Sequence, residues 1–418
     1  IGEFIKADSQ GNIIVVGNTD YSNNGYSRIN LIKQDKDANI IWHRTYVDSI
    51  TTYPDKAFDV AIDTFDNIYI AGRTNFDPSV PPPDYSQSLV LKYDSQGNLL
   101  WVRKWGNNLQ MGGGINRMKL FENKYVCVVG YMDSWITGYK NSFILQYDSS
   151  GVLNWSDTTY ANYNNFFVDV EQDKLGNSYI TGVTACCLPG FDTKVLKYNL
   201  SGNILWSKIL TDSIHHYIYP KDAVIDDSAN IYVGGEIKKT FGPNDYDFYL
   251  IKIDSSGSQK WFESYANTNA ADWENLNGLI LDFDNDCYLY GYISIGGGGQ
   301  GVPVINKFKK DGSFDWSWKY DSTNGGGGGI FYDALLVQDS SLIFGGSCKS
   351  INLSQAGAFA VSFNISGIKK WIYESSNKCN FKSIEEFDTS LFATGWDYAS
   401  PPTFNLDSLY KYFPVFIS

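Results

Sequence analysis

The sequence predicts an all-β fold built from repeated four-stranded antiparallel units, and three observations carry this prediction. Short runs of strand-forming residues alternate along the chain with turn residues, and their side chains follow a period of two rather than a helical period. A glycine closes one run in each of eight units. These glycines are Gly17, Gly72, Gly130, Gly182, Gly234, Gly291, Gly345 and Gly395. A tryptophan opens another run in seven units. These tryptophans are Trp42, Trp101, Trp155, Trp206, Trp261, Trp316 and Trp371.

Each unit contains four expected strands, which we name A to D. Strand A ends in an Asp-led turn such as residues 63–67, and strand B follows and ends at the repeated glycine. Strand C, for example residues 194–198 of one unit, is followed by a second turn, for example residues 94–98 of another unit. Strand D then starts at the tryptophan. An Asp side chain accepts hydrogen bonds from the amides ahead of it, and Gly or Asn tolerates a positive φ. We therefore interpret both segments as hairpin turns.

Four-stranded units repeated in this way are typical of the blades of a β-propeller. Open arrays usually carry terminal repeats of different character, and none is evident, so we predict a closed ring. The prediction is a single domain over residues 1–418, an eight-bladed β-propeller of four-stranded antiparallel blades with an incomplete last blade. A seven-bladed ring is the alternative. Residues 410–412 are followed by no tryptophan strand, so the missing strand comes from residues before Ile1, from residues 414–418, or is absent.

The strand-B glycine sits inside a strand, where glycine weakens pairing unless another backbone comes close. We therefore expect a close backbone approach at these glycines near the crowded centre of the ring. The tryptophan of strand D and the aromatic residue of strand C are expected to pack between blades.

The repeats resemble the bacterial and archaeal SBBP β-propeller repeats. The shared patterns are Gly-Asn-Ile-Tyr-Val-x-Gly and Lys-Tyr-Asp-x-x-Gly-Asn-x-x-Trp, and residues 11–17, 66–72, 92–101, 197–206 and 230–234 match them best. The resemblance implies a secreted or cell-surface protein, of the kind that Bacteroidetes export through the type IX system, whose sorting domain has been cleaved. The family name refers to seven blades, and this chain departs from it with eight copies.

Composition and charge exclude several classes of protein. A formal charge of −13 argues against a nucleic-acid backbone or an anionic membrane surface as partner, because both need clustered Lys and Arg. We find no apolar run long enough to cross a bilayer as a helix. Residues 1–7 show neither a basic head nor an apolar core, so we expect a processed N-terminus.

Topology predicts where a binding site lies. The short A–B and C–D turns share one face, whereas the long B–C and D–A connections share the other, and binding in such rings usually uses the variable loops. Exposed aromatic residues there could stack on sugars or anchor a protein partner. The alternative is that several fold back on the ring. The candidates are Tyr53, Tyr85, Tyr160, Tyr163, Tyr217, Tyr219, Trp273 and Tyr398.

We identify no catalytic residue, no metal site and no cofactor site. Asp282, Asp284 and Asp286 superficially resemble a calcium loop, but they align with an A–B turn and lack the required Gly and Glu. The chain has three histidines, His43, His215 and His216. This small number argues against a His-based catalytic triad or a His-based metal centre.

The six cysteines form no zinc-binding pattern. Cys348 and Cys379 both fall on the long-loop side and would pair in an extracellular protein. Cys127 and Cys287 fall in strand B and are expected to be small buried residues, and Cys186 and Cys187 are adjacent, so that pairing them would cause strain.

The leading hypothesis is therefore a secreted or cell-surface binding or structural module, without enzyme activity, that contacts a protein or glycan through the long-loop face. A carbohydrate-active enzyme using acidic residues at the central channel is the first alternative. A subunit of an extracellular or outer-membrane assembly is the second. Converging channel carboxylates would favour the enzyme, and a large apolar patch on the rim would favour the assembly.

Overall fold

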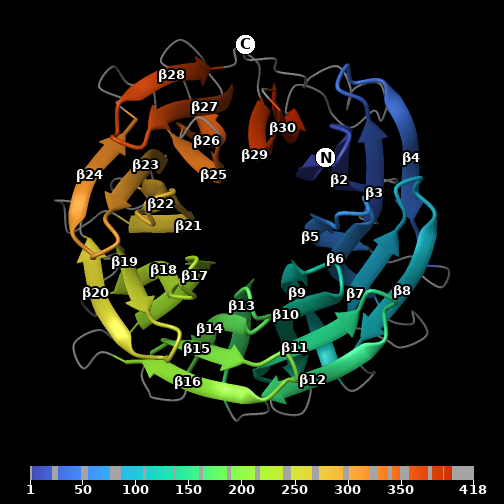
Figure 1. Cartoon of the computed structure of the whole chain (residues 1–418), viewed down its shortest axis with the longest axis horizontal. Helices are drawn as coiled ribbons and strands as arrows, with labels where there is room; N and C mark the ends of the chain where they lie inside the picture. The colour runs from blue at the N-terminus through green and yellow to red at the C-terminus, as the bar shows by residue number, and fades with distance from the viewer. Residues whose placement is uncertain are drawn as a thin grey trace.

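The computed structural model describes residues 2–20, 27–48, 55–75, 86–106, 110–134, 138–159, 163–185, 190–211, 217–238, 246–265, 273–294, 301–320, 328–337, 341–348, 357–374, 379–388 and 390–397. Within these ranges the chain forms thirty β-strands and no helix. The strands are arranged as sheets that radiate around a central axis (Figure 1).

The strands follow the predicted order A to D in each unit. Strands A are β1 (Gly2–Ala7), β5 (Lys56–Ile62), β9 (Gln110–Phe121), β13 (Asn165–Gln172), β17 (Tyr217–Ile225), β21 (Trp273–Leu281), β25 (Gly329–Leu336) and β29 (Cys379–Phe387). Strands B are β2 (Ile13–Asp20), β6 (Ile68–Asn75), β10 (Tyr125–Ser134), β14 (Ser178–Thr184), β18 (Ile231–Lys238), β22 (Cys287–Ser294), β26 (Ser341–Cys348) and β30 (Ser390–Asp397).

The outer half of each unit holds strands C and D. Strands C are β3 (Ser27–Gln34), β7 (Ser86–Tyr93), β11 (Lys140–Asp148), β15 (Asp192–Tyr198), β19 (Tyr246–Ile253), β23 (Gly301–Phe308) and β27 (Gly357–Asn364). Strands D are β4 (Ile40–Tyr46), β8 (Leu99–Trp105), β12 (Leu153–Thr159), β16 (Ile204–Leu210), β20 (Gln259–Tyr265), β24 (Phe314–Lys319) and β28 (Lys369–Glu374).

Neighbouring strands of a unit pair antiparallel in the order A–B–C–D, and we number these units blades 1 to 8 along the chain. The prediction of an all-β, multi-bladed propeller is confirmed. Blades 1 to 7 each have four strands, and the described part of blade 8 consists of β29 and β30. The number of strands that complete blade 8 stays a prediction, because residues 398–418 lie outside the described residues.

Blade 8 and blade 1 meet directly, so that the two ends of the described chain lie side by side (Figure 1). Ile5 and Ile13 of blade 1 are buried in one apolar cluster with Phe392 of blade 8. Lys6 of β1 forms an ion pair with Glu385 of β29, with 2.7 Å between Nζ and Oε2. The ring therefore has a packed joint between its first and last blades.

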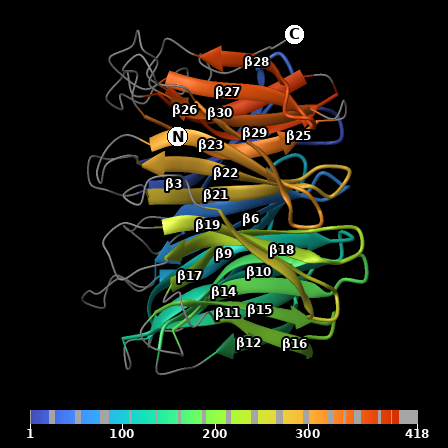
Figure 2. The ribbon, with the colours of Figure 1, turned by 90° about the vertical axis from the view of Figure 1, so that its left-hand side faces the viewer.

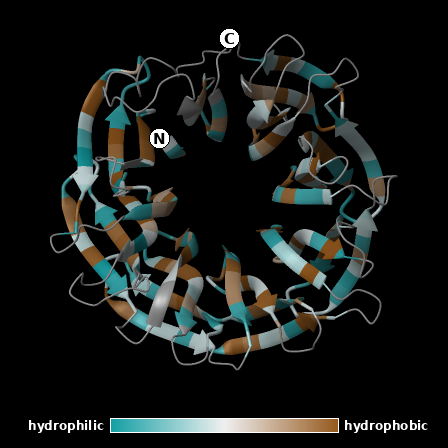
Figure 3. Cartoon of the chain, turned by 180° about the vertical axis from the view of Figure 1, so that it is seen from behind, coloured by the Kyte–Doolittle hydropathy of each residue, from teal (hydrophilic) through white to brown (hydrophobic). Residues whose placement is uncertain are grey.

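Apolar side chains fill the spaces between blades, because each sheet buries both of its faces against its neighbours. Ile14 and Leu31 of blade 1, for example, lie in one buried cluster with Val60 and Ile68 of blade 2. Apolar segments accordingly mark the strands inside the ring (Figure 3). The core is thus a circle of inter-blade layers.

All eight strands A carry a β-bulge at the same place, where one extra residue faces the partner strand B. The strand-B glycine lies opposite this bulge. A Cβ atom on Gly72 would come 2.1 Å from the carbonyl oxygen of Lys56, which confirms the expected close backbone approach. In blade 5 the glycine opposite the bulge is Gly235, one residue after Gly234. In blade 7 it is Gly346, one residue after Gly345.

A polar network within the repeat connects blades 1, 2, 4, 5 and 6 to the blade that follows each of them. In blade 2, Asp63 accepts hydrogen bonds from the turn amides of Phe65 and Asn67 at 3.0 and 2.9 Å, and its other oxygen accepts one from the Tyr69 hydroxyl. Lys92 extends past Asp63 and donates to the carbonyl of Ser149 in blade 3. This network accounts for the repeated Asp, Tyr and Lys.

Candidate functional site

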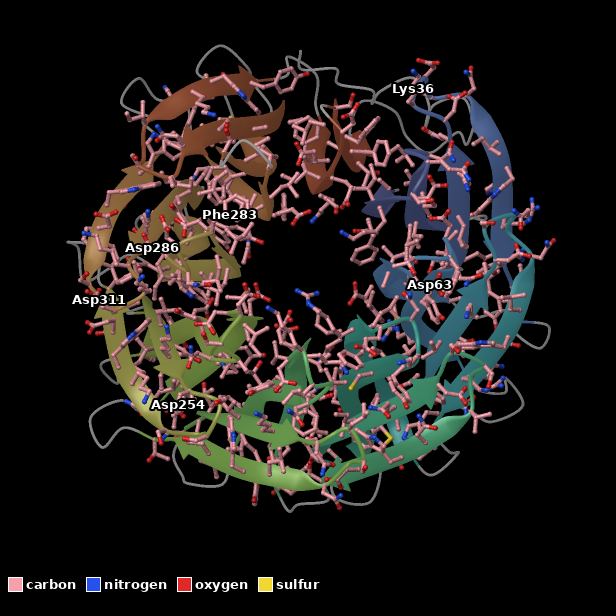
Figure 4. The ribbon with its side chains drawn as sticks, in the orientation of Figure 1. Lys36, Asp63, Asp254, Phe283, Asp286 and Asp311 are labelled. Carbon is pink, nitrogen blue, oxygen red and sulfur yellow. The ribbon has the colours of Figure 1, made fainter. Side chains whose placement is uncertain are left out.

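The short turns lie on one face of the ring, and the described strand ends that border the long connections lie on the opposite face, as predicted. The described A–B and C–D turns gather along one edge (Figure 2). Among them, the A–B residues Asp63 and Asp286 lie nearer the axis than the C–D residues Asp254 and Asp311 (Figure 4). We call the opposite side, where strands A and C begin and strands B and D end, the long-loop face.

The two faces expose different kinds of large apolar residue. Phe65, Leu175 and Phe283 at the tips of A–B turns are 64 to 78% exposed. Exposed aliphatic residues also begin several strands D on that edge. These are Ile40, Ile41, Leu99, Leu100, Leu153, Ile204 and Leu205. Next to the long connections, the exposed large residues are mainly aromatic. They are Tyr139, Tyr163 and Trp273, with Val47 and Ile209 as aliphatic exceptions.

A continuous row of six aromatic side chains from four blades crosses the long-loop face. Neighbouring ring centroids in this row lie 5.2 to 6.3 Å apart. We call the row the aromatic band. In order, it consists of Tyr131, Phe166, Tyr219, Tyr217, Tyr246 and Trp273.

Local strand geometry explains why the rings meet. Tyr217 and Tyr219 are two residues apart in β17, so they project on the same side of the strand and stack with an interplanar angle of 10°. Tyr246 begins β19 and Trp273 begins β21, and these two residues form the one parallel pairing between blades 5 and 6 in the described sheets. Their rings stack with centroids 5.2 Å apart.

A buried acid lies beneath the centre of the aromatic band. Glu236 of β18 is 3% exposed and forms an ion pair with Lys221 at 3.0 Å. Burial raises the pKa of Glu236, and Lys221 opposes this rise. Burial and the nearby Glu236 charge in turn raise the pKa of Tyr219 to about 12 and raise the pKa of Tyr217. The phenols therefore keep their protons at physiological pH.

Lysines lie over several rings of the aromatic band, in the geometry of cation–π contacts. The ammonium groups of Lys140, Lys221 and Lys238 are 3.7, 5.3 and 5.2 Å from the ring centroids of Tyr131, Tyr219 and Tyr246. Lys140 is also 3.4 Å from Asp133. The surface is thus aromatic with paired charges.

The structure brings together three of the predicted aromatic residues, Tyr217, Tyr219 and Trp273. Tyr163 is exposed, and no ring contact within the described part of the chain joins it to the aromatic band. The predicted residues Tyr53, Tyr85, Tyr160 and Tyr398 lie outside the described residues. Sequence analysis missed Tyr131, Phe166 and Tyr246, although their positions at strand ends next to long connections are the same signal.

Four carboxylates occupy the same repeat position on the inner strands, directly after the bulge. Each accepts a hydrogen bond from a backbone amide of the next blade. The pairs are Asp59 with Met118 at 2.8 Å, Asp169 with Ala223 at 2.8 Å, Asp222 with Leu279 at 2.7 Å, and Asp333 with Ile384 at 2.9 Å. Where blades 3 and 6 lack this Asp, the bulge residues Asn116 and Asn277 donate to carbonyls of the following blade. These side chains tie the inner strands together.

The densest group of charges on the inner strands lies across blades 3 to 5. Arg117 Nε is 3.6 Å from Asp169 Oδ1, and Asp169 in turn lies beside Asp222. Burial and the negative charge of Asp169 raise the pKa of Asp222 well above its usual value. Asp222 therefore ionises less readily than an exposed Asp. The carboxylates converge here, but each already binds a backbone amide.

The acidic turn at residues 282–286 is a hairpin turn, as expected. Asp282 accepts hydrogen bonds from the amides of Asp284 and Asp286 at 2.9 and 3.0 Å, and Lys307 pairs with Asp286 at 2.9 Å. Among the described residues, no group of three or more His, Cys, Asp or Glu side chains could hold a metal ion. His43 is half-buried beside Asn30, and His215 and His216 lie outside the described residues.

Cys348 is a buried free cysteine at the end of β26, where it contacts Tyr320. Its pairing with Cys379 stays a prediction. The side chain of Cys379 lies outside the described residues. Cys127 and Cys287 are buried in strand B, as expected, and burial raises the pKa of the Cys127 thiol to about 12.

Residues 49–78, which contain the A–B hairpin of blade 2, match the β-propeller repeat model SBBP. The chain carries an SBBP β-propeller repeat. The match confirms the resemblance to SBBP repeats in blade 2, which contains Asp63, Tyr69 and Gly72. No curated protein matches the chain. Within the described residues, no helix is long and apolar enough to cross a membrane.

Solved structures resemble the chain in fold. A polysaccharide lyase is 9% identical with a TM-score of 0.51, over 84% of this chain and 87% of the lyase chain. The β-propeller domain of the Trilobed protease from Pyrococcus furiosus is 9% identical with a TM-score of 0.49, over 90% and 96%. A Bacteroides caccae protein of unknown function is 14% identical with a TM-score of 0.40, over 74% and 94%. Similarity at these identities shows the fold alone.

Proposed function

We propose that the protein is a secreted or cell-surface recognition module that binds its partner, a protein or a glycan, through the long-loop face. The aromatic band carries this proposal. Six contacting rings on a rigid scaffold offer the large, pre-organised contact area that recognition surfaces use, and Trp273 at one end is 38% exposed. The SBBP repeat adds support for a location outside the cell.

We propose further that binding is not followed by chemistry. The carboxylates on the inner strands are the natural candidates for acid–base catalysis, and Asp59, Asp169 and Asp333 each have one oxygen bonded to an amide of the next blade. Both oxygens of Asp59 accept backbone amides, since Val60 donates to the second one. Carboxylates held in this way stabilise the ring.

The exposed aliphatic residues at the short-turn edge favour a second role as a subunit of an extracellular assembly. Leu99, Leu100, Ile204 and Leu205 are each 44 to 51% exposed on the outermost strands. Exposed apolar residues beside unpaired strand edges are typical of contact surfaces. Analytical ultracentrifugation of the purified protein, with Leu100→Ser as the variant, tests this role through the oligomeric state.

A binding assay on cell envelopes tests the recognition role. Fluorescently labelled protein is incubated with the envelope fraction of the organism that produces it, and retention is compared among variants. Trp273→Ala and Tyr246→Ala should reduce retention, whereas the short-turn variants Phe65→Ser and Leu175→Ser should not. Loss of retention in the short-turn variants alone would contradict the proposal.

A further inference from the structure

Building on the proposed recognition role, we propose that the aromatic band binds a neutral oligosaccharide that lies along it from blade 3 to blade 6. The ligand class follows from the rings, the hydroxyl groups, the pairing of charges and the length of the aromatic band.

The rings match the two-sided character of a sugar. A pyranose has an apolar C–H face and a rim of hydroxyl groups, and tyrosine offers an apolar face beside a polar tip. Four of the six residues in the aromatic band are tyrosines, namely Tyr131, Tyr217, Tyr219 and Tyr246. Because the pKa values of Tyr217, Tyr219 and Tyr246 are raised, these hydroxyl groups both donate and accept hydrogen bonds at neutral pH.

The charges around the aromatic band favour a neutral ligand. Lys221 is paired with Glu236 and Lys140 lies close to Asp133, so two of the three lysines over the rings are already compensated. The whole chain carries a formal charge of −13, which repels uronates and sulfated sugars. An anionic polysaccharide would need an uncompensated basic surface.

The length of the aromatic band favours an oligomer. Tyr131 in blade 3 and Trp273 in blade 6 are joined through four intermediate rings, and a single sugar would cover only part of this row. Several sugar units, each contacting one or two rings, would add their contributions.

The distribution of exposed residues favours a glycan over a protein on this face. The cores of protein interfaces combine aromatic anchors with aliphatic surface that is removed from water. Here most exposed aliphatic residues, such as Leu100 and Leu205, lie at the short-turn edge, whereas the rings of the aromatic band and Tyr163 lie on the long-loop face.

Isothermal titration calorimetry with defined sugars tests the proposal. The probes are neutral hexasaccharides of glucose, xylose and mannose, the corresponding monosaccharides, and hexagalacturonate as the anionic counterpart. At least one neutral hexasaccharide should bind, with its monosaccharide and hexagalacturonate binding about tenfold more weakly or worse. Trp273→Ala should weaken binding about tenfold.

Two further variants distinguish the contribution of ring stacking to sugar binding from that of hydrogen bonding, and exclude misfolding as the cause of weaker binding. Tyr217→Phe keeps the ring and removes the hydroxyl, so it should weaken binding less than Trp273→Ala does. Phe65→Ser, on the opposite face, should leave sugar binding unchanged, and thermal melting confirms that each variant is folded.

Absence of binding to every neutral hexasaccharide, or preferential binding of hexagalacturonate, would overturn the proposal. Envelope retention that depends on Trp273 but is not inhibited by any neutral hexasaccharide would retain the recognition role and reject the sugar ligand. Retention that is insensitive to Trp273 and Tyr246 would reject the recognition role itself.

Discussion

The indole of Trp101 in blade 2 lies against Gly151 in the C–D turn of blade 3. A Cβ atom on Gly151 would come 2.9 Å from the indole Cδ2, and Gly151 has a φ of 82°. Trp101 Nε1 also donates to the carbonyl of Ser149 in the same turn, at 3.2 Å. The same relationship joins Trp155 to Gly202 and Trp206 to Gly257. The repeated tryptophan and the repeated glycine are thus two halves of one contact between blades.

Gly151→Ala should therefore destabilise the protein. Both the positive φ and the indole oppose a Cβ atom, so we expect a loss of about 1 to 3 kcal/mol in the free energy of unfolding. Urea denaturation followed by tryptophan fluorescence measures this loss. Ala38 is the matched control, since it holds the equivalent turn position in blade 1 with a φ of 65°. Ala38→Gly should be neutral or slightly stabilising, and an unchanged midpoint for Gly151→Ala would contradict the argument.

Gly278 and Tyr290 form a second complementary pair. In blade 6 the position that holds Asp59 or Asp169 in other blades is Gly278, and the Tyr290 hydroxyl lies 2.2 Å from where its Cβ would be. Gly278→Ala should cost about 1 to 3 kcal/mol through this clash. The double variant Gly278→Ala with Tyr290→Leu should recover part of the loss. Additive losses in a double-mutant cycle by chemical denaturation would show that the two residues are independent.

Asp222→Asn should make stability less dependent on pH. The pKa of Asp222 is raised in the folded state by burial and by the Asp169 charge, whereas an unfolded Asp titrates near its usual value of about 3.9. A raised folded pKa gives stability that is fully present below the unfolded pKa and is lost as pH rises through the folded pKa. The neutral asparagine side chain avoids the cost of ionising a buried carboxyl group, so the variant should be more stable than the wild type at pH 8 and differ little from it at pH 4. Equal differences at both pH values would refute this.

The ion pair between Lys6 and Glu385 should contribute modestly to ring closure. The Lys6 side chain is 43% exposed, so solvent screens the pair and we expect about 0.5 to 1 kcal/mol. Lys6→Glu and Glu385→Lys should each lower the melting temperature, and the charge-swapped double variant should restore it. The test is differential scanning calorimetry at low and high salt, since the effects of the single variants should shrink with added salt.

Much of the fold was predictable because the repeat acts locally. The turn that Asp63 begins needs only residues 63–67, and the seven tryptophans all fall in strands D. The repeat pattern predicts the bulge glycine one residue early in blades 5 and 7, because Gly234-Gly235 and Gly345-Gly346 are double glycines and only the bulge register distinguishes them.

The candidate site was less predictable because it depends on contacts between blades. Tyr246 contacts both Tyr217 and Trp273 from the first position of a strand, so a prediction confined to the long connections does not include it. The Asp residues that bind the next blade share one position in the repeat, and this position is visible in the sequence. They are Asp59, Asp169, Asp222 and Asp333. Their partners, however, are backbone amides of the next blade, which no side-chain pattern reveals.

The joint between β1 and β29 has a consequence for biosynthesis. Lys6 and Glu385 are 379 positions apart, so β1 must wait until β29 has been synthesised before it gains its neighbour. Until then, Ile5 and Ile13 at the leading edge have no Phe392 to cover them, and the nascent arc presents an apolar edge. We expect this edge to be the part of the newborn chain that chaperones protect, and premature termination before β29 to yield a protein prone to aggregation.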